Sequence, residues 1–367
     1  MHNITTTKKI ICLIESLASG GAERQMTYLA TELKKAGYDV EVWTYYPSDF
    51  YLPILQENHV TYRYIPEATD KHKRILVLRR ELRQANPEVV IAYLDAACMA
   101  ACMIKAQGAR FQLIVSERNT TQRLTLKERL KFACYRFADY IVPNSYTQGK
   151  FIEEHYHNLK NKVTVITNFV DTDQFVPQHI ETNDPAPRIM VVGRIMPQKN
   201  PLMLMKAVKQ LQDKGIDIHV NWYGSAINND YHQQCINMVK DLQIESSFHF
   251  VVPTQNIAQE YPKHDIFCLP SIYEGFSNVL CEAMSCQLPV VCSNVCDNPV
   301  IVADESNGFL FNPTDADDIA LQLEKMISMP VAQRKQIGAN NRKRIQQTFS
   351  RQTFVQRYIS LIDPQSL

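Results

Sequence analysis

Two series of alternating strand and helix patterns, separated by one irregular interval, constrain the fold of this 367-residue chain most strongly. Short apolar runs typical of buried strands recur in both series. They are predicted at residues 9–15, 39–45, 60–65, 88–94, 112–116, 140–143 and 163–167, and then at 189–192, 218–223, 248–252, 266–269, 289–292 and 308–311. Helical patterns lie between most of them, for example at residues 22–36, 201–214, 231–242 and 278–286. Such alternation favours parallel, doubly wound α/β sheets.

The irregular interval at residues 171–188 predicts a linker between two domains. It contains Pro177, Pro185 and Pro187 among polar residues and has no periodicity. The chain length also suggests two domains, each able to bury its own core. After residue 315 the pattern is mostly helical, and it ends in a predicted helix at 351–362.

Composition argues for an ordinary globular protein in the cytosol. The chain is 45% hydrophobic, yet no apolar run approaches the roughly 20 residues of a membrane-spanning helix, and the start lacks a signal-peptide pattern. Ten cysteines without any Cys-x-x-Cys pair indicate reduced, mostly buried thiols. Residues 1–171 hold 23 Lys and Arg against 18 Asp and Glu, whereas the rest holds 16 against 20, so the first half is the more basic. No nucleic-acid partner is expected.

Glu274 and Glu282 form the constellation most suggestive of chemistry. Glu274 follows the apolar strand pattern at 266–269, and Glu282 lies about one turn into the next predicted helix, with Ser277 or Asn278 as its cap. Ligands of open α/β sheets bind outside the carboxyl ends of strands, and a helix N-terminus attracts phosphate. Two carboxylates at such a junction suit a ligand that joins phosphate to hydroxyls, as a nucleotide sugar does.

Two further loops follow the first strand of each series. Gly20 and Gly21 open the first helix, where paired glycines allow positive φ and close approach of the backbone to a ligand. They do not form a Gly-x-Gly-x-x-Gly fingerprint, so a dinucleotide is disfavoured. Gly193, Arg194 and Lys199 supply two cations after the strand at 189–192, and such cations bind phosphate.

The pattern Glu274-x7-Glu282, with Gly275 and Phe276 between, resembles the signature of retaining glycosyltransferases of family 4. The resemblance is clear over residues 187–312, moderate over 8–170 and weak in the final helices. It implies the GT-B fold, in which two Rossmann-like domains face each other across a cleft. The expected boundaries are an acceptor-binding domain at 1–170, a linker at 171–188, a nucleotide-sugar domain at 189–349, and a C-terminal helix at 350–367 crossing back to the first domain.

The resemblance also implies roles for the candidate residues. Glu282 would hold the ribose, Arg194 and Lys199 the diphosphate, and Glu274 the donor sugar, so Glu274, Arg194 and Lys199 are the expected catalytic group. Backbone N–H groups of Gly275, Phe276, Ser277 and Asn278 would complete the donor site together with Gly20, Gly21 and Gly193. The two fixed cations would replace a metal, so neither cofactor nor metal is expected. The donor would be a nucleotide-diphosphate sugar, with UDP favoured by the form Gly20-Gly21-Ala22-Glu23-Arg24.

Four features bear on the match. Gln287 stands where the family pattern has glycine, and Val300 replaces a common glutamate. Asp171-Thr172-Asp173 resembles an Asp-x-Asp metal motif, but it lies at the start of the linker and is rejected as a metal site. No histidine stands where many relatives have one near the reacting centre.

On the acceptor side, Asp95, Glu117, Arg118 and Asn119 follow predicted strands of the first domain and could contact a glycan. An ordinary loop explains them equally well. The acceptor would be a hydroxyl of a growing glycan, with a lipid-linked glycan as one form.

Basic residues interleaved with apolar ones at 71–83 and 118–136 suggest an anionic membrane surface as a partner and a peripheral location at the inner membrane face. The alternative is that the apolar side chains face the core and the cations, Lys131 and Arg74 among them, are merely solvated.

Two other functions stay open: a sugar-nucleotide 2-epimerase of similar shape, and a non-catalytic glycan or nucleotide binder. The fold alone decides between none of them.

Overall fold

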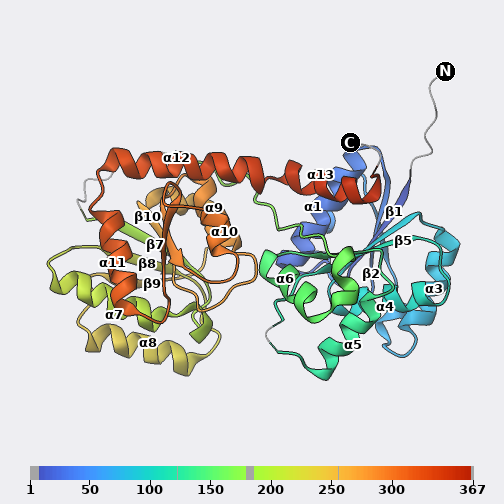
Figure 1. Cartoon of the computed structure of the whole chain (residues 1–367), viewed down its shortest axis with the longest axis horizontal. Coiled ribbons are helices and arrows are strands. Elements are labelled where there is room, and N and C mark those ends of the chain that lie inside the picture. Colours follow the sequence, from blue (N-terminus) through green and yellow to red (C-terminus); the bar gives the residue numbers. More distant parts are fainter. Residues whose placement is uncertain (1–7, 122, 179–185, 255, 365–367) are drawn as a thin grey trace, which may run out of the picture. The chain divides into compact units, whose positions relative to one another are not determined.

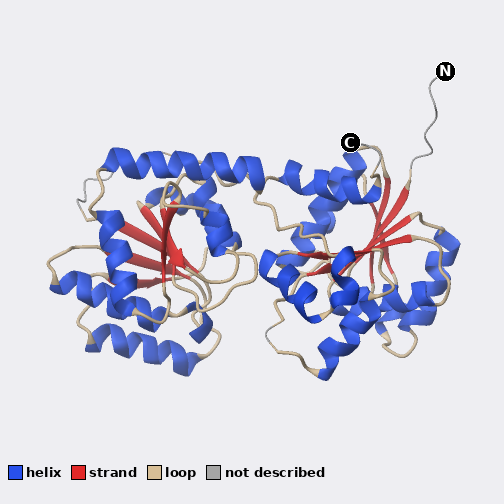
Figure 2. Ribbon diagram, viewed as in Figure 1, coloured by secondary structure: helices blue, strands red, loops and turns tan. Residues whose placement is uncertain are grey.

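The structure, a computed structural model, describes residues 8–121, 123–178, 186–254 and 256–364. The chain divides into two compact units, one made of Met1–Asn168 with Phe354–Leu367 and the other of Phe169–Thr353. The predicted linker lies partly outside the described residues, because 179–185 are not among them. Figure 1 shows the elements of each unit, and Figure 2 shows helices around a central sheet in both.

Unit 1 contains a parallel sheet of six strands in the order β3-β2-β1-β4-β5-β6. Its strands are β1 (Lys9–Leu13), β2 (Asp39–Thr44), β3 (Thr61–Tyr64), β4 (Val89–Tyr93), β5 (Gln112–Glu117) and β6 (Tyr140–Pro143). Its helices are α1 (Gly21–Lys35), α2 (Leu52–Glu57), α3 (Arg74–Ala85), α4 (Asp95–Ala106), α5 (Leu126–Tyr135), α6 (Tyr146–His155) and most of α13 (Arg351–Ile362).

Unit 2 repeats this topology, with the strand order β12-β11-β10-β7-β8-β9. Its strands are β7 (Arg188–Val192), β8 (His219–Tyr223), β9 (Phe248–Val251), β10 (Ile266–Leu269), β11 (Val290–Ser293) and β12 (Gly308–Phe311). Its helices are α7 (Pro201–Asp213), α8 (Asn229–Asp241), α9 (Asn278–Ser285), α10 (Asn298–Val302), α11 (Ala316–Ile327) and α12 (Val331–Thr348).

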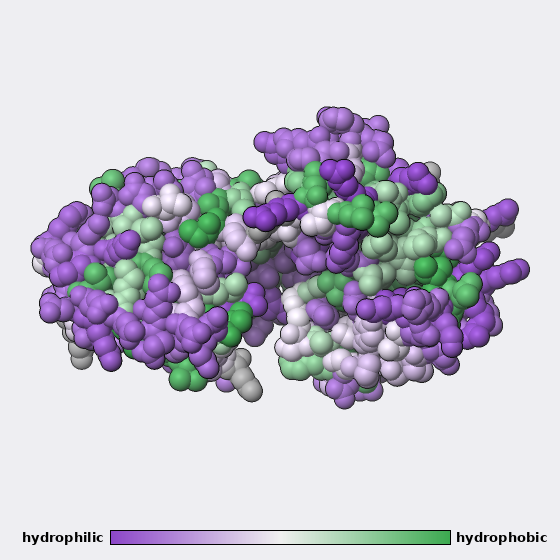
Figure 3. Space-filling model, turned by 90° about the horizontal axis from the view of Figure 1, so that it is seen from below, coloured by the Kyte–Doolittle hydropathy of each residue, from purple (hydrophilic) through white to green (hydrophobic). Residues whose placement is uncertain are grey.

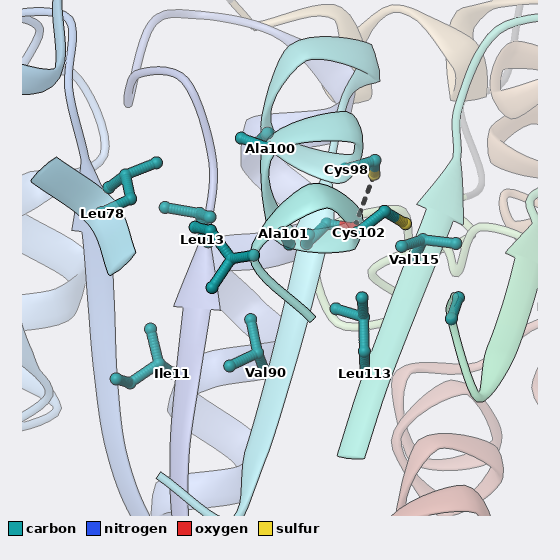
Figure 4. Close-up of a cluster of buried hydrophobic side chains, with 14 of the residues drawn as sticks. Ile11, Leu13, Leu78, Val90, Cys98, Ala100, Ala101, Cys102, Leu113 and Val115 are labelled. Atoms are coloured by element: carbon teal, nitrogen blue, oxygen red, sulfur yellow. Dashed lines mark hydrogen bonds between the residues drawn. The ribbon is translucent and has the colours of Figure 1, made fainter. Parts of the chain in front are cut away.

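Alternate residues of each strand point to opposite faces of the sheet, and helices cover both faces. In unit 1, one face packs against α3, α4 and α5. Figure 4 shows side chains from β1, β4 and β5 beneath α4, where the Cys98 thiol donates to the Ala92 carbonyl oxygen at 3.1 Å. All ten cysteines are free and eight are buried, as their apolar surroundings predicted.

The predicted strand at 163–167 is wrong. Thr164 N and Ile166 N donate to carbonyl oxygens of Ile141 and Pro143, but only an isolated bridge between Ile141 and Val163 forms. The segment therefore runs beside the edge strand β6 without extending the sheet.

The C-terminal helix α13 packs on unit 1. Tyr358 shares a hydrogen bond of 2.9 Å with Tyr93, and Gln112 donates to the Leu361 carbonyl oxygen. Asp363, just after α13, accepts from Tyr38 at 2.6 Å. Unit 1 is thus built from both ends of the chain.

Among the described residues, no helix is both long enough and apolar enough to cross a membrane.

Candidate active site

The strand order locates one ligand-binding position in each unit. In unit 2 the chain starts at β7 and builds outward on one side to β9, then returns to build from β10 on the other side. The loops after β7 and β10 therefore flank a topological switch point, where open α/β sheets bind their ligands. Gly193, Arg194 and Lys199 follow β7, and Glu274 follows β10. The predicted donor residues of these two loops thus share one edge of one sheet.

Glycines let the loop after β7 pack closely. A Cβ on Gly193 would lie 3.2 Å from Cδ of Lys199, so the lysine stem runs against the Gly193 backbone. A Cβ on Gly224 would lie 1.9 Å from the Gly193 carbonyl oxygen, which leaves room for no other residue type at Gly224. Gly224 was not predicted, although a glycine directly after the strand β8 was the available signal.

Lys199 and Glu274 form an ion pair. Nζ of Lys199 lies 2.5 Å from Oε1 of Glu274, and the two side chains are 14% and 11% exposed. Arg194 is exposed, and no carboxylate of the described part of the chain lies within ion-pair distance of it. The loop thus presents one cation already neutralised by a carboxylate and a second one that can meet an anion from solution.

Short hydrogen bonds tie the two loops together. The side-chain amide of Gln198 donates to the Tyr273 carbonyl oxygen at 2.9 Å, and the backbone carbonyl oxygen of Gln198 accepts from Ile272 N at 2.8 Å. Asn200 occupies the N-cap position before α7. Its side chain, however, donates to the carbonyl oxygens of Pro270 at 3.0 Å and Pro313 at 2.7 Å instead of capping the helix. Asn200 therefore holds loops in place.

The start of α9 is also held from outside the helix. Ser277 is the N-cap residue, one of the two expected, but its hydroxyl donates to Oδ1 of Asn298 at 2.6 Å and caps no backbone N–H. The Phe276 ring is buried and packs on Phe349 with ring centroids 5.4 Å apart. Of Phe276, the backbone is the part that a ligand can contact.

Glu282 lies in the second turn of α9 and is almost fully buried. Its carboxylate accepts from the hydroxyl of Tyr261 at 3.0 Å, and this tyrosine is itself completely buried. Tyr261 was missed because no motif marks it; it begins a short 3-10 helix, Tyr261–Lys263, and precedes the start of β10 by five residues. The Tyr261 hydroxyl fixes the direction of the Glu282 carboxylate.

In unit 1 the glycine loop follows β1, at the switch point between β1 and β4. Neither glycine uses the positive φ that glycine allows: Gly20 has φ −138° and ψ 162°, and Gly21 begins α1 with a negative φ. A Cβ on Gly20 would lie 2.1 Å from a carboxylate oxygen of Glu23, and a shift of that flexible side chain would make room for it. The Glu23 side chain, rather than a ligand, makes the close approach seen here.

The four acceptor-side candidates differ in accessibility. Asp95 opens α4 with a partly exposed carboxylate, and Asn119 is exposed. Glu117 is buried and paired with Lys131, so its side chain is out of direct reach of a ligand. Arg118 stacks on the Tyr93 ring at 4.0 Å and donates to Oδ1 of Asn168 at 2.6 Å, which makes it a structural link. Asp95 and Asn119 are thus the most accessible of the four, and acceptor contact by any of them stays a prediction.

Two predicted surface cations are buried instead. Lys131 is 1% exposed, and Arg74 is enclosed by Tyr45, Tyr46 and the Ala68 carbonyl oxygen.

Asp171 of the rejected Asp-x-Asp motif pairs with Arg351 and accepts from Asp173 N at 3.1 Å, so it has a structural role. No group of three or more potential metal ligands occurs in the described ranges.

Comparison with known proteins agrees with this arrangement. Residues 19–174 match the family described as Glycosyltransferase Family 4, and residues 173–344 match Glycosyl transferases group 1. A Campylobacter jejuni enzyme, GalNAc-alpha-(1->4)-GalNAc-alpha-(1->3)-diNAcBac-PP-undecaprenol alpha-1,4-N-acetyl-D-galactosaminyltransferase, is 26% identical over 333 residues, which cover 87% of this chain and 89% of that protein.

Two crystal structures show the same fold. A glycosyltransferase of Rickettsia africae superposes with a TM-score of 0.84 at 16% identity, covering 97% of this chain and 98% of that one. HepE of Anabaena in complex with UDP superposes with a TM-score of 0.82 at 19% identity, covering 97% of this chain and all of that one. The fold is GT-B, as the motif resemblance predicted. Since the two family matches together run from residue 19 to residue 344, this chain is a glycosyltransferase and belongs to glycosyltransferase family 4.

Proposed function

We propose that this protein transfers a sugar from a UDP-sugar, with retention of configuration, to a hydroxyl of a lipid-linked glycan. The observation that carries the proposal is the Lys199–Glu274 ion pair at the switch point of unit 2, beside the exposed Arg194. A nucleotide sugar presents a diphosphate next to a ring of hydroxyls, which needs cations and a carboxylate side by side. Support comes from UDP bound to HepE and from the undecaprenol-linked glycan named for the Campylobacter relative.

In this proposal each charged residue of the site binds a different part of the donor. Arg194 and Lys199 bind the diphosphate and stabilise the charge that develops on it as the glycosidic bond breaks. Glu274 accepts hydrogen bonds from the sugar hydroxyls, and Glu282, oriented by Tyr261, accepts them from the ribose. The acceptor hydroxyl attacks from the face that the diphosphate leaves, and a phosphate oxygen takes its proton.

The proposal includes independence from metal ions. Two fixed cations at the diphosphate supply the charge that a divalent ion supplies in other transferases. Turnover is expected to persist in EDTA, measured against the same reaction with added magnesium. Loss of turnover in EDTA and its recovery with magnesium would remove Arg194 and Lys199 from this role.

The experiment that tests the function is a donor and acceptor panel. UDP-glucose, UDP-galactose and UDP-N-acetylgalactosamine are each incubated with a polyprenyl diphosphate glycan ending in N-acetylgalactosamine, and the linkage of the product is read by NMR. An α-linked product from an α-linked donor is expected. A β-linked product would overturn retention, and an isomerised donor without acceptor would favour the 2-epimerase. Binding of donors without any conversion would favour the non-catalytic binder.

We further propose that α5 contacts the anionic membrane that holds such an acceptor. Leu126 and Leu130, four residues apart on α5, are 74% and 55% exposed, and the exposed cations Arg123, Lys127 and Arg129 surround them. Figure 3 views unit 1 from the side on which α5 lies and shows hydrophobic side chains among hydrophilic ones. Apolar side chains set among cations are what an anionic lipid surface binds.

Liposome partitioning tests this surface. Leu126→Ser with Leu130→Ser, or Arg123→Glu with Arg129→Glu, should release the protein from vesicles that contain phosphatidylserine, at about 1 kcal/mol per cation removed. Arg79→Glu with Arg80→Glu on α3 is the matched control, because it reverses the same number of cations and the two arginines already bind Gln107 and Glu81, respectively. Equal release by the α3 and α5 variants would mean that net charge alone drives partitioning.

A further inference from the structure

A buried charge cluster in unit 1 lies directly behind Asp95. Lys131 of α5 reaches between two carboxylates: its Nζ is 2.9 Å from Oε2 of Glu117 and 3.4 Å from Oδ1 of Asp95. Tyr135, one turn further along α5, donates its hydroxyl to Glu117 at 3.1 Å. The Lys131 side chain is 1% exposed and that of Glu117 is not exposed at all, whereas that of Asp95 is 19% exposed. Asp95 is therefore the one carboxylate of this cluster that a ligand can contact.

Asp95 also occupies the position where a ligand of unit 1 is expected. The sheet order reverses between β1 and β4, and the carboxyl ends of these two strands flank the switch point. β4 ends at Tyr93, and Asp95 follows it after one residue, Leu94. Leu94 has φ 71° and ψ 152°, a combination that is costly for a residue with a Cβ. This backbone conformation starts α4 immediately at Asp95. The backbone conformation of Leu94 thus places Asp95 at the switch point, and the buried Lys131 holds its carboxylate from the interior side.

Stability does not account for this cluster. Removing an ammonium and a carboxylate from water costs more than their attraction usually returns, and well-packed apolar residues serve a core better. Burial lowers the pKa of Lys131, but the adjacent Glu117 and Asp95 outweigh it and hold that pKa above its ordinary value, so the ammonium stays charged. A charged lysine anchored on a buried glutamate offers Asp95 a fixed partner.

We propose that Asp95 binds a hydroxyl of the acceptor glycan and that Lys131, anchored by Glu117, is the positioning residue that orients its carboxylate. This inference rests on the proposed transfer to a glycan. The lysine contacts of Asp95, at 3.3 Å from Lys127 and 3.4 Å from Lys131, are long and leave lone pairs for a sugar hydroxyl. Lys127 is 70% exposed, whereas the buried Lys131 links Asp95 to Glu117 in the interior.

The test separates acceptor binding from donor binding, with UDP-N-acetylgalactosamine and a polyprenyl diphosphate glycan ending in N-acetylgalactosamine. Asp95→Asn should raise the acceptor KM about tenfold to a hundredfold, the range for losing a hydrogen bond to a charged group, with UDP affinity unchanged. Lys131→Met combined with Glu117→Gln removes both buried charges while keeping the volume, so the unit can still fold. It should raise the acceptor KM in the same way, whereas Lys150→Ala, at an exposed position on α6, should not.

A double-mutant cycle completes the test. If Lys131 acts through Asp95, adding Asp95→Asn to the Lys131→Met and Glu117→Gln variant should change the acceptor KM little further. Lys131→Arg should restore part of the acceptor affinity. An unchanged acceptor KM in Asp95→Asn, or full additivity in the cycle, would overturn the inference. If the unmodified chain transfers no sugar from any donor of the panel, the proposed function falls and this inference falls with it.

Discussion

Arg194 and Lys199 lie five residues apart after the same strand, but their surroundings differ. Lys199 packs along Gly193 and pairs with Glu274, while Arg194 extends into solvent. The exposed guanidinium contributes little to the fold, so its replacement should report on ligand binding alone. The lysine serves both the fold and the ligand.

Arg194→Ala should therefore lower kcat about 100-fold, as expected for one lost preorganised donor, and leave the melting temperature unchanged. Lys199→Ala should lower both, because it leaves the Glu274 carboxylate largely buried without its cation. Lys206→Ala, at an exposed position on α7, is the matched control. Steady-state kinetics and thermal melts measure the two effects. A large drop in melting temperature for Arg194→Ala would contradict its assignment as a ligand-binding cation.

The two glutamates should also separate. Glu282→Gln should weaken UDP binding, since ribose contacts are equal in the ground and transition states, while Glu274→Gln should mainly lower kcat. Tyr261→Phe removes the hydroxyl that orients Glu282 and should weaken UDP binding to a smaller degree. Calorimetric titration with UDP measures all three variants. Equal losses of UDP affinity in the two glutamate variants would refute the division of roles.

At the scale of elements, Asn200 joins the start of α7 to the loops after β10 and β12. It has φ 61°, a left-handed conformation, and its amide donates to two buried carbonyl oxygens. Asn200→Gly keeps the left-handed backbone conformation but leaves both carbonyl oxygens without their hydrogen-bond donor. Each loss should lower the free energy of unfolding by roughly 1–3 kcal/mol. Asn200→Ala should lose about a further 1–2 kcal/mol for its Cβ. Urea unfolding tests whether stability falls from the parent to Asn200→Gly and then to Asn200→Ala. An Asn200→Gly variant as stable as the parent would show that these two hydrogen bonds do not stabilise the loops.

The turn from α9 to β11 carries a second left-handed residue, Gln287, with φ 62°. This explains why the family pattern has glycine there. Gln287→Gly relieves about 1–2 kcal/mol of strain against about 0.5–1 kcal/mol of added chain entropy, so stability should rise slightly. Gly338→Ala should instead destabilise by about 1–3 kcal/mol, because its Cβ would lie 1.9 Å from the Gln287 carbonyl oxygen and push α12 away. Thermal melts of both variants check these opposite signs.

Most elements could be predicted from the sequence because their signals are local. A strand buried on both faces, such as β10, is a short apolar run, and its neighbours bring Lys199 and Glu274 to one edge. What the sequence could not predict depends on partners distant in the chain. Lys131 has the same composition signal as the solvated Lys127, yet tertiary packing buries it against Glu117. Likewise, the pattern at 163–167 is strand-like, but the segment makes too few hydrogen bonds to join β6.

For the whole molecule, the four donor-side charged residues Arg194, Lys199, Glu274 and Glu282 belong to unit 2. UDP at 100 times its dissociation constant should therefore stabilise the transition of unit 2 by about 2.7 kcal/mol. Differential scanning calorimetry with and without UDP measures this shift, and Arg194→Ala should reduce it at the same UDP concentration. A shift of equal size in Arg194→Ala would show that UDP binds without that cation.

The division of unit 1 between the two ends of the chain has a consequence for its synthesis. On the ribosome, β1 to β6 emerge first, whereas Tyr358 of α13, which contacts Tyr93, is made only after all of unit 2. Unit 2 is continuous from Phe169 to Thr353 and can fold before release, reversing the usual order in which N-terminal domains mature first. Until α13 has been made, the sheet of unit 1 lacks the helix that supplies this contact, and a chain truncated after Thr353 would leave that part of the sheet open to chaperones and proteases.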